Sequence, residues 1–223
     1  MSVYMTEEEQ LEAIKKWWNK HGNKILTIVS VVLLCIAGYR YFYWHQQKMS
    51  QQASTVYENM MVSYSRHNFK SVRAYANELI KDYGHTVYAD AAHMTLAKVF
   101  IEKEKINRAK KELYAVSEKA HMPQLKQIAK IRLARILTVE KEYGNALKEL
   151  NAMNDPAYLS VINELKGDVY SATGEFDNAI KAYRMAMSEA KNNGMGNSFL
   201  EMKSNELAIK TQKIIANEHQ KTT

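Results

Sequence analysis

Cysteine is almost absent from this chain, in which Cys35 is the single thiol among 223 residues. One cysteine cannot form an intrachain disulfide, and no cysteine is left outside the N-terminal region to bind a metal or to act as a nucleophile. The seven histidines form no HxxxH or HExxH pair. Glycine-rich phosphate loops and GxSxG elbows are also missing. We therefore expect no enzymatic activity, and no catalytic residue, cofactor or metal site.

Proline and glycine are scarce as well, with two prolines and eight glycines in the chain. Both residues interrupt regular structure, so their scarcity favours long elements. Runs that alternate apolar and polar residues, as half-buried strands do, are missing, whereas apolar residues recur at helical spacing throughout. The sequence therefore predicts an all-α fold.

One long apolar run stands out near the N-terminus. Residues 25–38 carry no charge, and an aromatic cluster, broken only by Arg40, follows them up to Trp44. At a rise of ~1.5 Å per residue, residues 25–44 form a helix of ~30 Å, the thickness of a bilayer's hydrocarbon core. The run therefore predicts a transmembrane anchor. A cleaved signal peptide and a lipidated Cys35 are the alternatives, against which the long preceding region and the bulky neighbours of Cys35 argue.

Basic residues flank the predicted anchor unequally. Four lysines precede it and two cations follow it closely, namely Lys15, Lys16, Lys20 and Lys24 against Arg40 and Lys48. Because Lys and Arg favour the cytoplasmic side, we expect residues 1–24 to form a cytoplasmic tail. Residues 45–223 then lie outside the cytoplasm, in the periplasm if the cell is Gram-negative. In the tail, the Thr6-x-x-Glu9 pattern is a capping box and predicts a short amphipathic helix.

Residues 161–190 have the residue spacing of a tetratricopeptide repeat. Small residues let two antiparallel helices approach, tyrosines fill the space between them, and a glycine permits the turn. The residues concerned are Gly167, Tyr170, Gly174, Phe176, Ala179, Tyr183 and Ala186. Weaker copies of the pattern precede this unit, and residues 57–80 predict one more helix pair. Residues 45–223 therefore predict a tetratricopeptide-like domain, which an amphipathic helix over residues 198–215 caps.

The first helix of each tetratricopeptide unit lines a concave groove. The register of the repeats places two rows of residues in that groove: Lys98, Arg135 and Asp168, with Met94, Ile131 and Glu164 beside them. Mixed charged and apolar side chains suit an extended peptide or a segment of another protein. An ordinary solvated surface is the alternative interpretation of the same six residues.

The net charge of +7 is, by itself, compatible with nucleic-acid binding. However, Lys and Glu are interspersed at helical spacing, as in residues 102–105 (EKEK), which is typical of a solvated helical surface. We therefore expect no nucleic-acid partner. Attraction to anionic membrane lipid is a further option, because the domain is tethered close to the headgroups.

Both ends of the chain resemble one bacterial family. The similar pieces are residues 8–15, the Trp17-Trp18 pair, Gly22, the segment 38–41 and residues 202–209. They are similar to the YfgM family, the ancillary SecYEG translocon subunits. The resemblance implies an inner-membrane protein with one span and a periplasmic tetratricopeptide-like domain. It also implies two partners, the SecYEG translocon and a membrane-anchored periplasmic chaperone of the peptidyl-prolyl isomerase type, and no catalytic residues.

The anchor, the repeats and the resemblance lead to one functional hypothesis. The chain is expected to be a membrane-anchored adaptor at the Sec translocon that helps to transfer exported polypeptides to periplasmic chaperones through protein–protein binding. The alternative is a tetratricopeptide scaffold that organises other cell-envelope assembly proteins, because the fold alone does not choose the partner.

Overall fold

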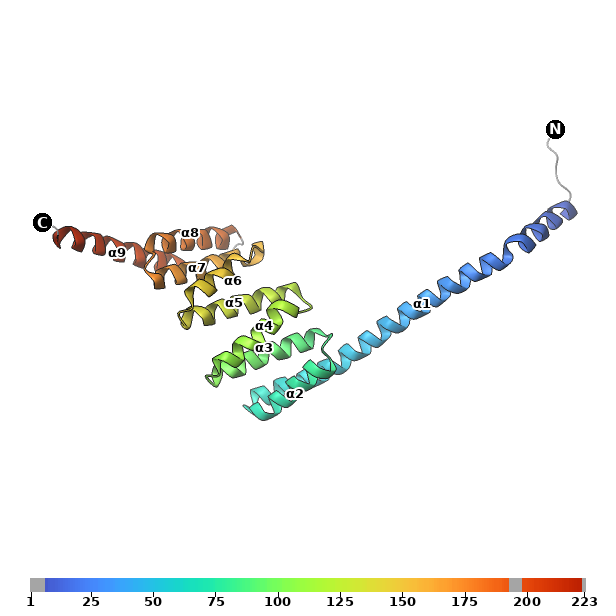
Figure 1. The fold of residues 1–223 in the computed structure, drawn as a ribbon, viewed down its shortest axis with the longest axis horizontal. Coiled ribbons are helices and arrows are strands. Elements are labelled where there is room, and N and C mark those ends of the chain that lie inside the picture. The colour runs from blue at the N-terminus through green and yellow to red at the C-terminus, as the bar shows by residue number, and fades with distance from the viewer. Residues whose placement is uncertain (1–6, 193–197, 222–223) are drawn as a thin grey trace, which may run out of the picture. The chain divides into compact units, whose positions relative to one another are not determined.

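A computed structural model of the chain describes residues 7–192 and 198–221 (Figure 1). The described residues contain α-helices and one short 3₁₀ helix but no strand, so the predicted all-α fold is confirmed. The elements are α1 (Glu7–Ser65), α2 (Phe69–Asp82), α3 (Val87–Glu102), α4 (Ile106–Lys119), α5 (Pro123–Val139), α6 (Tyr143–Asn151), η1 (Pro156–Tyr158), α7 (Leu159–Thr173), α8 (Phe176–Asn192) and α9 (Ser198–Lys221). Thr6 of the predicted capping box lies outside the described residues.

Helix α1 is 59 residues long and contains the whole apolar run. The side chains of that run are exposed, for example Leu33 at 60% and Leu34 at 72%. Among the described helices, α1 is the one long and apolar enough to cross a membrane, as the sequence predicts. The predicted segment boundaries at residues 24 and 44 both fall inside this helix, so neither marks a break in it.

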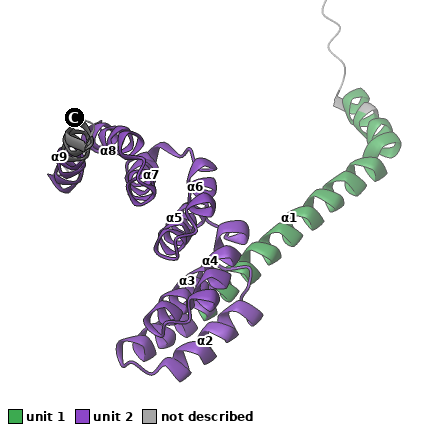
Figure 2. Ribbon diagram, turned by 60° about the vertical axis from the view of Figure 1, so that its left-hand side comes forward, with its two compact units in different colours: residues 1–52 green, residues 53–223 purple. Residues whose placement is uncertain are grey.

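The chain divides into two compact units, residues 1–52 and 53–223, and the division falls inside α1 (Figure 2). In the second unit the end of α1 pairs with α2, and three further pairs follow: α3 with α4, α5 with α6 and α7 with α8. Buried aliphatic residues form successive clusters between neighbouring pairs. Each pair therefore buries its apolar faces against the next, as a repeat array does.

The turn inside each helix pair has the same backbone geometry in all four pairs. One residue in each turn has a positive φ: His67 at 55°, Glu104 at 56°, Lys141 at 63° and Gly174 at 82°. In each turn this residue and the next donate their amide protons back to the preceding helix, as in the pairs Lys141 N to Thr138 O (3.1 Å) and Glu142 N to Leu137 O (2.8 Å). These bonds satisfy carbonyls at the helix end. The first helix pair, α1–α2, is therefore a repeat of the same kind as the other three.

The close approach of α7 and α8 depends on Gly167, as the sequence predicts. A Cβ atom at Gly167 would lie 2.5 Å from Cε1 of Tyr183, whose ring is buried. The ring cannot turn away freely, because the Tyr183 hydroxyl donates a hydrogen bond of 2.7 Å to Asp168. Glycine is therefore required where the tyrosine enters the space between the two helices.

The capping helix α9 buries two apolar residues, Leu200 and Leu207, in a cluster with α8. Three other residues that the helical pattern assigns to the same packing face, Phe199, Met202 and Ile209, are more than half exposed. The contact is therefore narrower than the amphipathic pattern indicates. The helix continues to Lys221, beyond the predicted end at residue 215, and the side chain of Ile214 lies outside the described part.

We expect Gly167→Ala to destabilise the repeat domain by about 1–3 kcal/mol, because the new methyl group overlaps the fixed Tyr183 ring. Gly144→Ala is the matched control, since a Cβ at this exposed helical glycine meets nothing within 4 Å. It should be neutral or slightly stabilising. Thermal unfolding of the full chain, followed by circular dichroism, measures both changes. Equal melting temperatures for the two variants would contradict the packing argument.

We expect Lys141→Gly to stabilise the domain by about 0.5–1 kcal/mol. Glycine adopts the left-handed conformation without the steric cost of a Cβ, which exceeds the extra backbone entropy that glycine loses. Lys141→Ala is the control, because it removes the same side chain and keeps the Cβ. Denaturant unfolding should show a gain for the glycine variant and none for the alanine variant. A gain in both would assign the effect to the lysine side chain instead.

Candidate protein-binding groove

Two adjoining hollows lie along the first helices of the repeats. One, of about 470 Å³, is lined on α3 by Lys98, Ile101 and Glu102, and on α5 by Arg132, Arg135 and Ile136. The other, of about 280 Å³, is lined chiefly by Tyr57, Met94, Lys98, Leu125, Ile128 and Arg132. Since Lys98 and Arg132 line both, the hollows form one surface over α1, α3 and α5, which we call the groove.

The structure brings three of the six predicted groove residues together here. Lys98 and Arg135 line the larger hollow, and Met94 contributes to the floor of the smaller one. Because Met94 is only 8% exposed, its side chain is a packed part of the hollow's lining and not a flexible surface side chain. Lys98 and Arg135, in contrast, are exposed and available for a partner.

The other three predicted residues are placed differently. Ile131 is buried in a core cluster between α5 and α7, and it lines neither hollow. Glu164 and Asp168, on α7, are already engaged by the chain itself. Nζ of Lys203, on α9, donates to a carboxylate oxygen of Asp168 at 2.8 Å and of Glu164 at 3.1 Å. The six residues therefore do not form one uniform surface.

Burial and charge act together on this α7–α9 contact. Burial by itself lowers the pKa of Lys203, but the carboxylates of Asp168 and Glu164 outweigh it and leave the pKa raised. Burial also raises the pKa of the Tyr183 hydroxyl, and Asp168 raises it further. Lys203 is therefore a cation, and Tyr183 a neutral donor, across the physiological range. At the α7 repeat, α9 already occupies the groove position.

Positive charge dominates the groove over α3 and α5. The guanidinium groups of Arg132 and Arg135 have no ion-pair partner within the described ranges. The one acid in the larger hollow, Glu102, accepts a short hydrogen bond from the Tyr64 hydroxyl. Nζ of Lys98 lies 4.9 Å from the centroid of the Tyr64 ring, and the Tyr64 hydroxyl raises the pKa of Lys98. The groove thus offers cations beside aliphatic and aromatic walls.

The repeat register could also have identified Arg132 as a groove residue, although neither of the two predicted rows includes it. Thr95, Arg132 and Leu165 occupy the equivalent place one turn before Lys98, Arg135 and Asp168. The register could not have identified Tyr64 or Lys203. Tyr64 contacts a residue 38 positions away along the chain, and Lys203 contacts residues 35 and 39 positions away.

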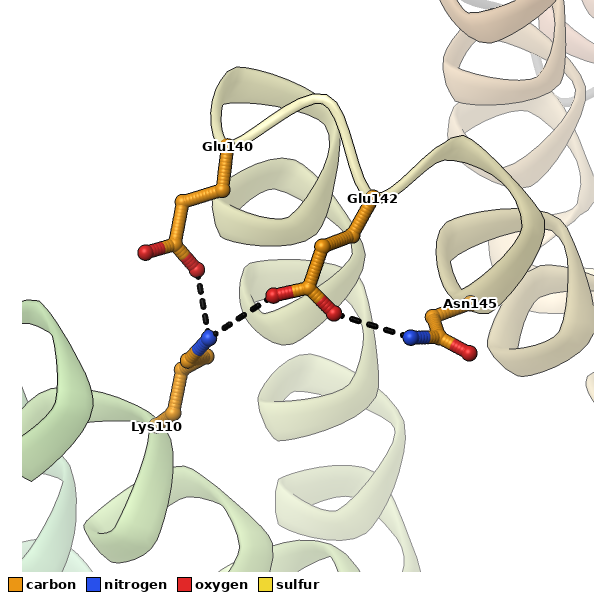
Figure 3. A network of polar contacts seen from close by, with 4 residues as sticks. All are labelled: Lys110, Glu140, Glu142 and Asn145. Carbon is orange, nitrogen blue, oxygen red and sulfur yellow. Dashed lines mark hydrogen bonds and ion pairs between the residues drawn. The ribbon is translucent and has the colours of Figure 1, made fainter.

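A separate polar network holds neighbouring repeats together (Figure 3). Nζ of Lys110, on α4, donates to carboxylates of Glu140 (2.5 Å) and Glu142 (3.0 Å) in the turn between α5 and α6. The side-chain amide of Asn145 donates a hydrogen bond of 2.8 Å to the other carboxylate oxygen of Glu142. The hydrogen bonds to Glu140 and Glu142 raise the pKa of Lys110, and the hydrogen bonds from Asn145 and Lys110 lower the pKa of Glu142. The network is structural, because its charges are satisfied within the chain.

No group of three or more His, Cys, Asp or Glu residues in the described part of the chain is placed to hold a metal ion. The groove combines charged groups with apolar walls, a composition that is also found in protein–protein interfaces.

The sequence profile of the tetratricopeptide repeat-like domain family matches residues 15–209, and the chain belongs to this family. Among curated proteins, the chain is similar to the "Ancillary SecYEG translocon subunit" of Aggregatibacter actinomycetemcomitans, with 27% identity over 85% of this chain and 93% of the relative. Proteins of the same name from Escherichia coli (strain K12) and Neisseria gonorrhoeae are 25% and 24% identical, over 94% and 93% of this chain and all of each relative. These relatives confirm the family resemblance. No solved structure matches the chain.

We expect Lys203→Met and Asp168→Asn to be coupled. Each substitution removes one side of the ion pair that ties α9 to α7, so each should destabilise the domain, and the double variant should lose less than the sum. A double-mutant cycle of unfolding free energies should give a coupling of about 1–2 kcal/mol, since the pair is partly exposed. Additive losses would show that α9 is held by its apolar contacts alone.

Proposed function

We propose that the chain is a membrane-anchored adaptor at the SecYEG translocon, which helps to transfer exported proteins to periplasmic chaperones. The groove over α3 and α5 is the observation that carries this proposal, because its unpaired cations and apolar walls suit a segment of another protein. The relatives named as ancillary translocon subunits support the place of action. The fold and the relatives also support a non-catalytic role.

The N-terminal half of α1 supplies the anchor in this proposal. Its apolar run spans the bacterial inner membrane, and the lysines before the run keep the N-terminus in the cytoplasm. The repeat domain then lies in the periplasm, where exported chains emerge. Because a tether raises the effective concentration of a binding site near its partner, the groove needs only modest affinity for each segment.

Two kinds of partner segment fit the groove. One belongs to a membrane-anchored periplasmic chaperone of the peptidyl-prolyl isomerase type, and the other to an exported chain in transit. Both offer extended or helical segments with apolar side chains, which contact the Met94, Leu125 and Ile128 walls. The cations at the rim of the groove favour segments that also carry carboxylates.

Site-specific photocrosslinking in native membranes tests this proposal. A photoreactive residue is placed at Lys98, Arg132 or Arg135 in the groove, and at Lys181 or Arg184 on α8 as the matched exposed control. We expect SecYEG subunits, a periplasmic chaperone or exported chains to be captured from the groove positions and not from α8.

Adducts only with cell-wall or outer-membrane assembly factors would favour the alternative scaffold function. Equal capture from the groove and from α8 would contradict a specific groove. Deletion of the repeat domain separates the anchor from the groove, since retention of translocon association by the anchor alone would assign docking to the membrane span.

A further inference from the structure

Another hollow lies on the other side of α3 and is lined by residues of α2, α3 and the turn between α3 and α4. It measures about 460 Å³, and six of its lining residues carry the argument: Phe69, Lys70, Arg73, Phe100, Lys103 and Lys105. We call it the basic hollow. Of the described residues that line it, none is acidic.

The basic hollow is distinct from the groove. Lys98, Ile101 and Glu102 of α3 line the groove, whereas Phe100 of α3 and Lys103, the residue directly after the helix, line the basic hollow. At 100° per residue, these two sets fall on opposite sides of the helix. A ligand in one hollow therefore leaves the other accessible.

The cations of the basic hollow lack carboxylate partners. Lys70, Arg73, Lys103 and Lys105 make no ion pair among the residues the structure describes. Elsewhere in the domain, the partly buried cations Lys110 and Lys203 each contact two carboxylates of the chain. Four cations gathered around one hollow without an acid repel one another, and an anionic partner relieves that repulsion.

The floor of the basic hollow is apolar. Phe69 and Phe100 line it, and two cations lie against their rings: Lys103 Nζ is 4.3 Å from the Phe69 centroid, and the Arg108 guanidinium is 5.9 Å from that of Phe100. The cation–π contact with Phe69 holds Lys103 at the hollow, whereas Arg108 is not one of the lining residues. A ligand that fits both features carries negative charge and apolar groups together.

We propose that the basic hollow is a docking site for an acidic, amphipathic segment of a partner protein. Its carboxylates pair with Lys70, Arg73, Lys103 and Lys105, and its apolar side chains contact the phenylalanine floor. A phosphate of a lipid headgroup fits less well, because the cations are divided between α2 and the turn that joins α3 to α4, and one phosphate leaves the apolar floor uncovered. The proposal goes beyond the groove and does not rest on its function.

The test uses the full chain in nanodiscs of zwitterionic lipid. The probe is a fluorescein-labelled peptide of alternating glutamate and leucine, and its glutamine–leucine counterpart is the neutral probe. Binding is followed by fluorescence anisotropy. We expect the acidic peptide to bind, the neutral one to bind more weakly, and the affinity to fall as salt rises.

Three double variants locate the binding. Lys70→Gln with Arg73→Gln removes two cations of the basic hollow, and we expect it to weaken the acidic peptide about tenfold. Lys181→Gln with Arg184→Gln removes the same pair of residue types at the same spacing on an exposed face of α8, and should change little. Arg132→Gln with Arg135→Gln removes two cations of the groove, and so tests whether the acidic peptide binds there instead. All six positions are exposed, so the folds are retained.

Equal weakening by the α2 and α8 variants would overturn the proposal, because the peptide would then follow net charge alone. Loss only with the Arg132 and Arg135 variant would also overturn it and assign the acidic peptide to the groove. Displacement of the peptide by glycerol phosphate, with the same sensitivity to Lys70 and Arg73, would replace the acidic segment with a lipid headgroup. No binding of the acidic peptide would overturn the proposal outright.

Discussion

Two helices of one repeat approach closely where a small residue leaves room between them. At Gly167, this close approach determines which further residues come into contact. The missing side chain admits the Tyr183 ring, and the ring places its hydroxyl against Asp168. Asp168 in turn binds Lys203, so that α9 is held across the end of the array. Packing at Gly167 thus leads to the pairing of Asp168 with Lys203. The carboxylate of Asp168 is therefore not free for a partner, because α9 of the same chain already binds it.

The distribution of satisfied and unsatisfied charge separates structure from function in this domain. Several charged groups between helices have partners within the chain: Lys110 pairs with Glu140 and Glu142, and the buried Asp90 accepts a hydrogen bond of 2.8 Å from the amide of His121. None of the described residues that line the basic hollow is acidic, and in the groove Arg132 and Arg135 make no ion pair among the described residues. Partly buried charge costs stability unless it is paired. Exposed cations contribute little to folding, and the proposed partners would supply carboxylates for these cations.

The sequence predicts the helices, the membrane-spanning run and the last repeat well, because each depends on local spacing. Gly174 indicates its turn because glycine is typical of a positive φ, whereas His67, Glu104 and Lys141 adopt the same conformation with no such signal. Their conformation is imposed by the helices on either side and by the backbone bonds of the turn. The backbone therefore shows that α1–α2 is a repeat of the same kind, whereas its amino-acid sequence indicates this only weakly.

The groove was predictable only in part, for a similar reason. Register identifies which side of a helix a residue occupies, and Lys98 and Arg135 both line the larger hollow. It does not determine how deeply a neighbouring helix covers that side, and Ile131 is buried by the approach of α7. Nor does it reveal that Lys203, 35 residues after Asp168, neutralises the last position.

The two proposed binding surfaces on opposite sides of α3 would give the domain a property that a single groove lacks. A partner with two suitable segments contacts both, and the second contact forms at the effective concentration that the first one sets. Each surface is then able to remain weak and exchange rapidly while the whole complex persists. Positive charge on both surfaces also speeds the encounter with acidic segments, an effect that salt reduces. For the membrane-anchored adaptor proposed above, weak separate contacts would hold a permanent partner without trapping a transient one.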